Sequence, residues 1–294
     1  MGLCASCTTT ISSSTSSVKG QDKITTSLAT HLLSHHKSTS LLQHILSFHS
    51  SPNPKDYINL RSSSKLFHRA LPQPPPLWTS FPHSNHTTLQ SLVDRLEELH
   101  SSPHSGNVPS VLFIEEGEYG CGKTARWGDY IRVNKPLSIY GAGRRKTTLV
   151  GVGLMIKGNK ITSQGIVEIE DLTIKGGEWS GLCANEGMNV IIKNVSVEKC
   201  QMNGVFACRA DISCNDLQVI GCGESGVCAI EAIITLSGKG TSIQSNGTKG
   251  KCNHHGLHAD LRSSKIHLVH PLTKEQISTN NGGGGNWGGG GTIE

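Results

Sequence analysis

Short segments of alternating apolar and polar residues recur through the second half of the chain, separated by turns rich in Gly, Asn and Asp. One element, Gly-x-x-Ala, occurs four times in this half of the chain, at Gly181–Ala184, Gly204–Ala207, Gly226–Ala229 and Gly256–Ala259. The spacings between the first glycines are 23, 22 and 30 residues. Alternation with a period of two predicts strands, and a repeat of this length without helical pattern predicts one solenoid coil per repeat.

The alignment of the repeats predicts which side chains lie inside the solenoid. Coils stacked about 4.8 Å apart place equivalent residues above one another. Apolar residues at one position of three coils should line the interior: Leu172, Val195 and Leu217. The residues before them should form a polar ladder at a turn: Asp171, Asn194 and Asp216. Because side chains alternate along a strand, Val205 and Val227 should point inward and Cys228 outward.

Further strand-like segments precede the repeat, at residues 111–119, 136–143 and 147–151. Together with the repeat, these segments resemble the pectin-lyase-like β-helix proteins over residues 108–294. The resemblance implies a mainly β fold, a right-handed parallel β-helix solenoid with a small α-helical N-terminal segment.

Residues 72–107 should form a Pro-rich linker followed by a capping helix. The prolines between Pro72 and Pro76 favour a stiff extended spacer. Thr87–Gln90 reads as a capping box at the start of a helix. Apolar residues then fall on one helix face: Leu89, Leu92, Val93, Leu96 and Leu99. Such a helix would cover the open N-terminal coil, whose unpaired edge otherwise invites aggregation.

Residues 39–71 show apolar positions at helical spacing, which predicts a helical hairpin. The segment resembles an F-box, although no Leu-Pro pair opens it and Ser63 and Ser64 stand where a Val-Cys pair is usual. The resemblance implies docking to an adaptor of a cullin-type ubiquitin ligase through six residues: Leu41, Leu42, Ile45, Leu46, Pro54 and Leu60. The alternative is a hairpin that packs only on its own neighbour.

Residues 1–38 form a Ser/Thr-rich segment that we expect to be disordered. Gly2 and Ser6 match the myristoylation pattern, and Cys4 and Cys7 could carry palmitoyl groups. The alternatives are a disordered start without lipid and an organelle transit peptide. The sequence contains neither an 18-residue apolar run nor a secretory signal, so we expect a cytoplasmic protein that associates with membranes only through this anchor.

The positive charge is confined to the N-terminal segment. The chain has a formal net charge of +5, and residues 1–70 contain seven Lys or Arg against Asp22 and Asp56. The remaining chain is neutral, which excludes the basic surface that nucleic-acid binding requires. For a cytoplasmic protein the cysteines are expected to be free thiols, with Cys200, Cys222 and Cys252 stacked as buried apolar residues.

Three motifs could carry chemistry. Gly117–Thr124 matches the phosphate-binding loop, but no helix can follow because Gly128 and a strand-like segment come next. The Asp171, Asn194 and Asp216 ladder could hold a cation, although turn side chains more often bond their own backbone. The His254-His255-Gly256 segment resembles the Gly-His-Gly of polygalacturonases, without their paired aspartates.

The sequence therefore predicts an interaction scaffold that presents a β-helix face to a protein client, with the F-box-like hairpin making it a ubiquitin-ligase substrate receptor. The alternative is a carbohydrate-active β-helix enzyme, of the polysaccharide lyase or hydrolase kind. We expect no catalytic residues, no metal and no cofactor.

Overall fold

The computed structural model describes residues 78–102, 108–120, 130–158 and 165–294. The chain divides into two compact units, residues 1–71 and 72–294, and every described residue belongs to the second unit. The F-box-like hairpin and the N-terminal acylation motif therefore lie outside the described residues.

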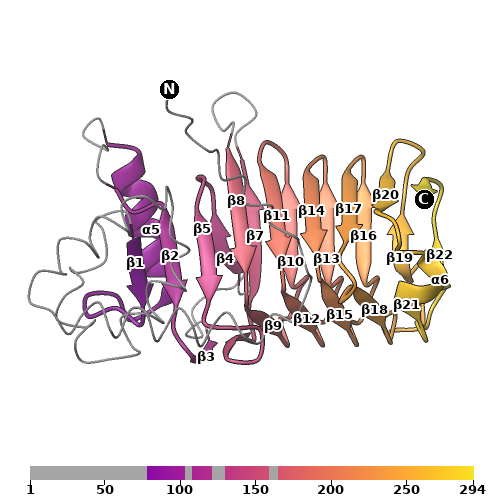
Figure 1. The fold of residues 1–294 in the computed structure, drawn as a ribbon, viewed down its shortest axis with the longest axis horizontal. Helices are drawn as coiled ribbons and strands as arrows, with labels where there is room; N and C mark the ends of the chain where they lie inside the picture. Colours follow the sequence, from indigo (N-terminus) through magenta and orange to yellow (C-terminus); the bar gives the residue numbers. More distant parts are fainter. Residues whose placement is uncertain (1–77, 103–107, 121–129, 159–164) are drawn as a thin grey trace, which may run out of the picture. The chain divides into compact units, whose positions relative to one another are not determined.

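The second unit is a parallel β-helix, in which each coil contributes one strand to each of three parallel sheets (Figure 1). Sheet 1 contains β1 (Trp78–Phe81), β2 (Val111–Ile114), β5 (Ser138–Gly141), β8 (Ile166–Glu170), β11 (Asn189–Lys193), β14 (Asp211–Asn215), β17 (Ile233–Ser237), β20 (Lys265–Leu268) and β23 (Thr292–Ile293). Sheet 2 contains β4 (Tyr130–Val133), β7 (Gly153–Lys157), β10 (Leu182–Asn185), β13 (Val205–Cys208), β16 (Val227–Ile230), β19 (His255–Ala259) and β22 (Gly285–Gly288). Sheet 3 contains β3 (Gly117–Gly120), β6 (Thr147–Val150), β9 (Thr173–Lys175), β12 (Ser196–Glu198), β15 (Gln218–Ile220), β18 (Ser242–Gln244) and β21 (Ser278–Thr279).

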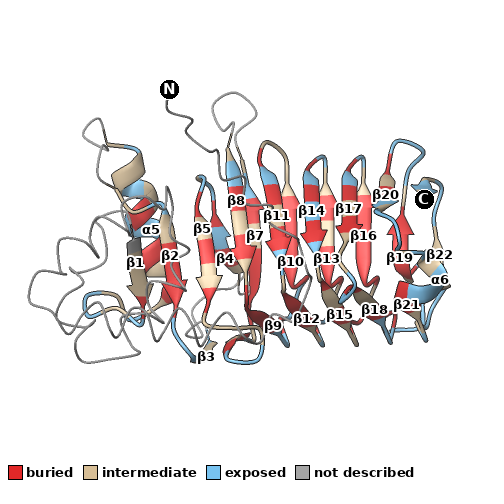
Figure 2. Cartoon of the chain, in the orientation of Figure 1, coloured by how far each residue is buried: buried red, intermediate tan, exposed pale blue. Residues whose placement is uncertain are grey.

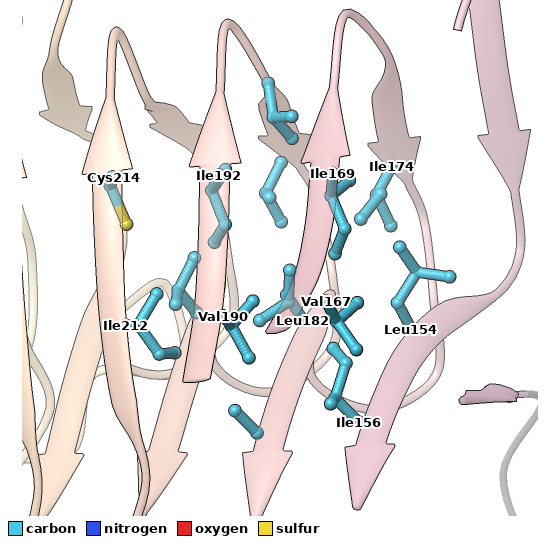
Figure 3. Close-up of a cluster of buried hydrophobic side chains, with 14 of the residues drawn as sticks. Leu154, Ile156, Val167, Ile169, Ile174, Leu182, Val190, Ile192, Ile212 and Cys214 are labelled. Atoms are coloured by element: carbon cyan, nitrogen blue, oxygen red, sulfur yellow. The ribbon is translucent and has the colours of Figure 1, made fainter. Parts of the chain in front are cut away.

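The interior is a stack of aliphatic side chains from all three sheets, as the repeat predicts. Leu172, Val195 and Leu217 are fully buried, and so are Val205 and Val227, which pair directly between β13 and β16. Figure 3 shows side chains of neighbouring strands, among them Val190, Ile192 and Ile212, pointing into the same space. No single coil could bury these residues alone, so each coil depends on its neighbours for stability.

The predicted capping helix is α5 (Leu89–His100). Its N-cap residue Thr88 accepts a hydrogen bond from the Ser91 N–H, and its buried face consists of Leu89, Leu92, Val93 and Leu96. The Arg132 N–H of strand β4 donates to the Gln90 side chain at 2.7 Å, which fixes the helix against the first coils. Strand β1 within residues 72–107 was not predicted, and it pairs with β2 in sheet 1. A second, short helix, α6 (Lys274–Ile277), lies in the last coil.

The four repeated glycines lie where two coils approach most closely. A Cβ on Gly204 would lie 2.6 Å from the Gly226 carbonyl oxygen, and one on Gly226 would lie 2.7 Å from that of Gly256. Both distances are below those of normal contacts. Side chains are therefore excluded at this position, which explains why the repeated element begins with glycine.

Each repeated glycine also covers an inward polar or thiol side chain of the next coil. Cys200 packs against the Gly181 position, Cys222 against Gly204 and Asn246 against Gly226. The ladder continues with Asn281, which packs against the Gly256 position. We call these four residues the Cys–Asn ladder.

The Cys–Asn ladder hydrogen-bonds the backbone of the preceding coil. The Cys222 N–H donates to Asn246 Oδ1 at 2.9 Å, and the Asn246 N–H donates to Asn281 Oδ1 at 2.9 Å. The sulfur atoms of Cys200 and Cys222 accept the backbone N–H groups of Gly177 and Cys200 in the same way. Thiol and amide side chains thus fill one structural role, since both accept a buried N–H that water cannot reach.

The prediction that Cys252 joins this stack is wrong. Cys252 is exposed, and the residue equivalent to Cys222 is Asn246, because β15 and β18 pair Ile220 with Gln244. The fourth repeat is longer than the others because residues are inserted after the ladder position, which moves the cysteine into a turn.

Candidate interaction surface

The outer face of sheet 2 carries an unusually apolar row of side chains. The third residue of each Gly-x-x-Ala element points outward, and parallel pairing joins these residues into one line across β7, β10, β13, β16 and β19. The line consists of Met155, Cys183, Phe206, Cys228 and His258. We call it the outer apolar row. Five strands spaced about 4.8 Å apart make it about 19 Å long.

The thiols of the row lie in the depressions between its larger members. Cys183 and Cys228 are only 7% and 6% exposed although they take outward positions. Their strands, β10 and β16, are buried over most of their length (Figure 2). An outward position does not make Cys228 a surface residue, because the side chain is covered, with Phe206 and His258 paired on either side. Burial raises the pKa of the Cys183 thiol to about 11 and that of Cys228 to about 12, so both thiols stay uncharged near neutral pH.

A cluster of three histidines lies at one end of the row. The His255 and His258 rings stack with centroids 5.1 Å apart, and His258 Nε2 lies 3.3 Å from Asp260 Oδ1. Burial lowers the pKa of His254 and of His255, so both are neutral near pH 7. Within the described residues, no three His, Cys, Asp or Glu side chains are grouped so that they could hold a metal ion.

The outer face of sheet 1 carries mostly polar side chains, together with the exposed Ile166 and Ile233. Strand β14 alternates exposed and buried residues, with Asp211, Ser213 and Asn215 facing solvent. Further along this face, Tyr140 Oη donates to Glu168 Oε2 at 2.7 Å and Lys193 forms an ion pair with the same carboxylate. Burial opposes ionisation of Glu168, but the hydrogen bonds from Lys193 and Tyr140 hold its pKa below the ordinary value.

The Glu168 group does not have the arrangement that glycoside hydrolysis needs. Such enzymes place a raised-pKa acid and a second carboxylate on opposite sides of the bond to be cleaved. Glu168 is instead neutralised by Lys193 and has a lowered pKa, which makes it a weak base and a poor acid. The group is best described as an ion pair that links β8 to β11.

A charged turn borders the outer apolar row. Arg209 follows strand β13 and pairs with Glu186 of the preceding coil at 2.6 Å and with Glu231 of the next at 3.8 Å. A shallow cavity of about 780 Å³ opens beside this turn, with Asn189 and Asp211 also in its lining. The apolar row thus has a charged rim on one side.

The Asp171, Asn194 and Asp216 ladder lies at a turn, as predicted. All three residues have positive φ angles near +50 to +60°, which Asn and Asp adopt more readily than other residues with a side chain. Asn194 donates to the Asp171 carboxylate, and Asp216 accepts the Gly240 N–H at 2.7 Å. The Arg144 guanidinium also reaches this turn and donates to the Asp216 carbonyl at 3.2 Å. These contacts fit a structural turn rather than a cation site.

The other predicted sites cannot be placed in the structure. The six F-box-like positions and the acylation residues Gly2, Cys4 and Cys7 lie outside the described residues. Gly117–Gly120, the start of the phosphate-loop match, form strand β3, and residues 121–129 lie outside the described part. Within the described residues, no helix is long and apolar enough to span a membrane.

Comparison with known proteins finds one distant structural likeness and no relative by sequence. No protein family profile matches the chain, and no curated protein matches it. Among solved structures, the A-module of the mannuronan C-5 epimerase AlgE4 from Azotobacter vinelandii is similar. That likeness covers 70% of this chain and 92% of the epimerase module, with 12% sequence identity and a TM-score of 0.21. A likeness at this level gives no information on activity.

Sequence reasoning missed the outer apolar row although the sequence contains its signal. The third residues of the four elements are Cys183, Phe206, Cys228 and His258, where a solvent-facing strand position is normally polar.

Proposed function

We propose that the protein is an interaction scaffold that binds a protein client along the outer apolar row. The row itself supports the proposal, because Met155, Cys183, Phe206 and Cys228 follow one another without a charged side chain along the solvent side of sheet 2. Met and aromatic residues are enriched in the cores of protein interfaces, and charged residues in their rims. Phe206 is the aromatic anchor at the middle of the row, and the Glu186–Arg209–Glu231 turn is its rim.

A variant in the row should separate client binding from folding. We expect Phe206→Lys to weaken client binding by more than about tenfold, since removal of a central aromatic anchor commonly costs 2 kcal/mol or more. Its side chain faces outward, so the fold should persist. The matched control is Ser213→Lys on the outer face of sheet 1, which is exposed.

The measurement is quantitative affinity capture with the full chain as bait. The proposal requires proteins that bind wild type and Ser213→Lys equally and that are depleted with Phe206→Lys. Circular dichroism should show the same fold in all three baits. If every captured protein binds the two variants to the same extent, the row is not a client surface.

The F-box-like hairpin supports a finer proposal, that the protein links its client to a ubiquitin ligase. We expect a purified adaptor of a cullin-type ligase to bind the full chain, and Leu42→Asp to abolish this binding because a charge would enter an apolar contact. Gln43→Asp is the matched control at a polar position. Surface-immobilised binding measures both variants, and absence of binding to wild type would refute adaptor docking while leaving client binding untouched.

A further inference from the structure

Two buried thiols face one another across consecutive coils of the β-helix interior. Strands β12 and β15 pair with Glu198 opposite Ile220, and the same offset places Cys200 opposite Cys222. The alignment continues beyond the strands, because the Gly223 N–H donates to the Cys200 carbonyl at 2.8 Å. We propose that these residues form an oxidative modification site, at which a disulfide joins the two coils.

The spacing of the coils suits a disulfide. Equivalent residues of adjacent parallel strands lie about 4.8 Å apart, within the Cα separation of about 4.4 to 6.8 Å that disulfides span. Both side chains are inward, at 1% and 0% exposure. Both also have the same orientation, since each sulfur packs against the repeated glycine of the preceding coil, at Gly181 and Gly204.

The two thiols are in direct contact and differ in acidity. The hydrogen bond between Cys222 and Cys200 and the Gly177 N–H stabilise the Cys200 thiolate, so the pKa of Cys200 is lowered. The same bond and burial raise the pKa of Cys222 well above its ordinary value. A thiolate is the attacking species in disulfide exchange, and either thiol of the opened pair can supply it.

The oxidant is a small disulfide such as oxidised glutathione, which reaches the pair while the coils are still opening or folding. The Cys200 thiolate attacks one glutathione sulfur, so the glutathione S–S bond breaks and one glutathione thiolate leaves. Cys222 loses its proton and attacks the Cys200 sulfur of the mixed disulfide, which releases the second glutathione. Two protein thiols are oxidised and one glutathione disulfide is reduced to two thiols.

Three other cysteines of the described solenoid, Cys183, Cys214 and Cys228, have no cysteine opposite them in the adjacent strands. Cys214 is equally inward but pairs with Ile192 and Leu236 in the adjacent strands (Figure 3). Cys183 and Cys228 are separated by Phe206 in the outer apolar row. Cys183 and Cys228 therefore have no neighbouring sulfur with which to form a disulfide. Cys214 also has none and is as buried as Cys200 and Cys222, so it serves as an internal control.

The test uses the full chain, unfolded in urea with reductant and refolded in a buffer of oxidised and reduced glutathione, with a fully reducing refolding in parallel. Refolding removes the problem of access to a buried site. Free thiols are alkylated after denaturation, and the protein is digested and mapped by mass spectrometry without reduction. We expect linked Cys200 and Cys222 peptides, two hydrogens lighter than the sum of the reduced peptides, and alkylated Cys214.

The disulfide should also raise the melting temperature of the oxidised protein by about 5 to 10 °C over the reduced protein, by constraining the unfolded chain. Reductant should reverse the shift in wild type, and Cys222→Ser should lack both the link and the shift. The proposal is wrong if the protein that has refolded to its native structure in the oxidising buffer keeps both thiols free, or if Cys200 is linked mainly to a different cysteine.

Discussion

Val227→Asp is expected to lower the free energy of unfolding by about 3 to 5 kcal/mol, the cost of an uncompensated buried charge. Val227 is fully buried and is stacked between Val205 and Leu257 of the adjacent coils. A carboxylate at this position would meet only aliphatic side chains, without a cation or donor to compensate it. Because domains are typically stable by only about 5 to 15 kcal/mol, much of the stability would be lost.

Denaturant unfolding at neutral pH measures this loss, with Ser213→Asp as the matched control on an exposed outer position. The control should change the stability by about 0.5 kcal/mol or less, as surface substitutions do. Similar losses in the two variants would mean that the inward and outward assignments are exchanged, since a shift of one residue moves every side chain of a strand to the other face.

Asn246→Leu is expected to cost about 1 to 3 kcal/mol, because it leaves the buried Cys222 N–H without a partner. Asn246 is fully buried. Its Oδ1 accepts the Cys222 N–H at 2.9 Å, and its Nδ2 donates to the Val219 carbonyl at 3.2 Å. Leucine fills a similar volume but offers neither an acceptor nor a donor, so the loss reports the hydrogen bonds rather than a cavity.

Two further substitutions test the Cys–Asn ladder by the same denaturant measurement. Asn215→Leu makes the same chemical change on the exposed face of β14, where Asn215 donates only to Ser237, and should cost under about 1 kcal/mol. Asn246→Cys should cost less than Asn246→Leu, because a thiol accepts the N–H at the equivalent positions 200 and 222. An Asn246→Cys protein as unstable as Asn246→Leu would contradict the shared role of the two side chains.

The interior of the solenoid was predictable from the sequence because it follows from local alternation and from a repeat. Leu172, Val195 and Val227 could be assigned inward positions by aligning the repeated elements, and α5 by its capping box and its apolar face. Both signals come from residues that are near one another in sequence or equivalent between coils.

The failures arose where burial depends on neighbours in other coils. Cys228 faces outward by alternation, and only the size of Phe206 and His258 in the adjacent strands covers it. Cys252 matches the repeat by its distance from Gly256, whereas the pairing of β15 with β18 shows that Asn246 holds the position. Strand β1 was missed because it pairs with β2 across the intervening helix α5, and nothing local marks it as a strand.

The Cys–Asn ladder gives the β-helix a direction. In each coil the backbone N–H of the ladder residue donates a hydrogen bond to the ladder side chain of the next coil. The last of these N–H groups, that of Asn281, donates to Asn286 Oδ1 at 3.1 Å. A unit of 22 or 23 residues carries one such acceptor and one repeated glycine. It can therefore form the same coil-to-coil contacts with the coil before it and the coil after it. Duplication of such a unit within the gene would lengthen the solenoid and the outer apolar row. Only the contacts between the two coils on either side of the new unit would change. The length of the outer apolar row can thus change in whole steps of one coil.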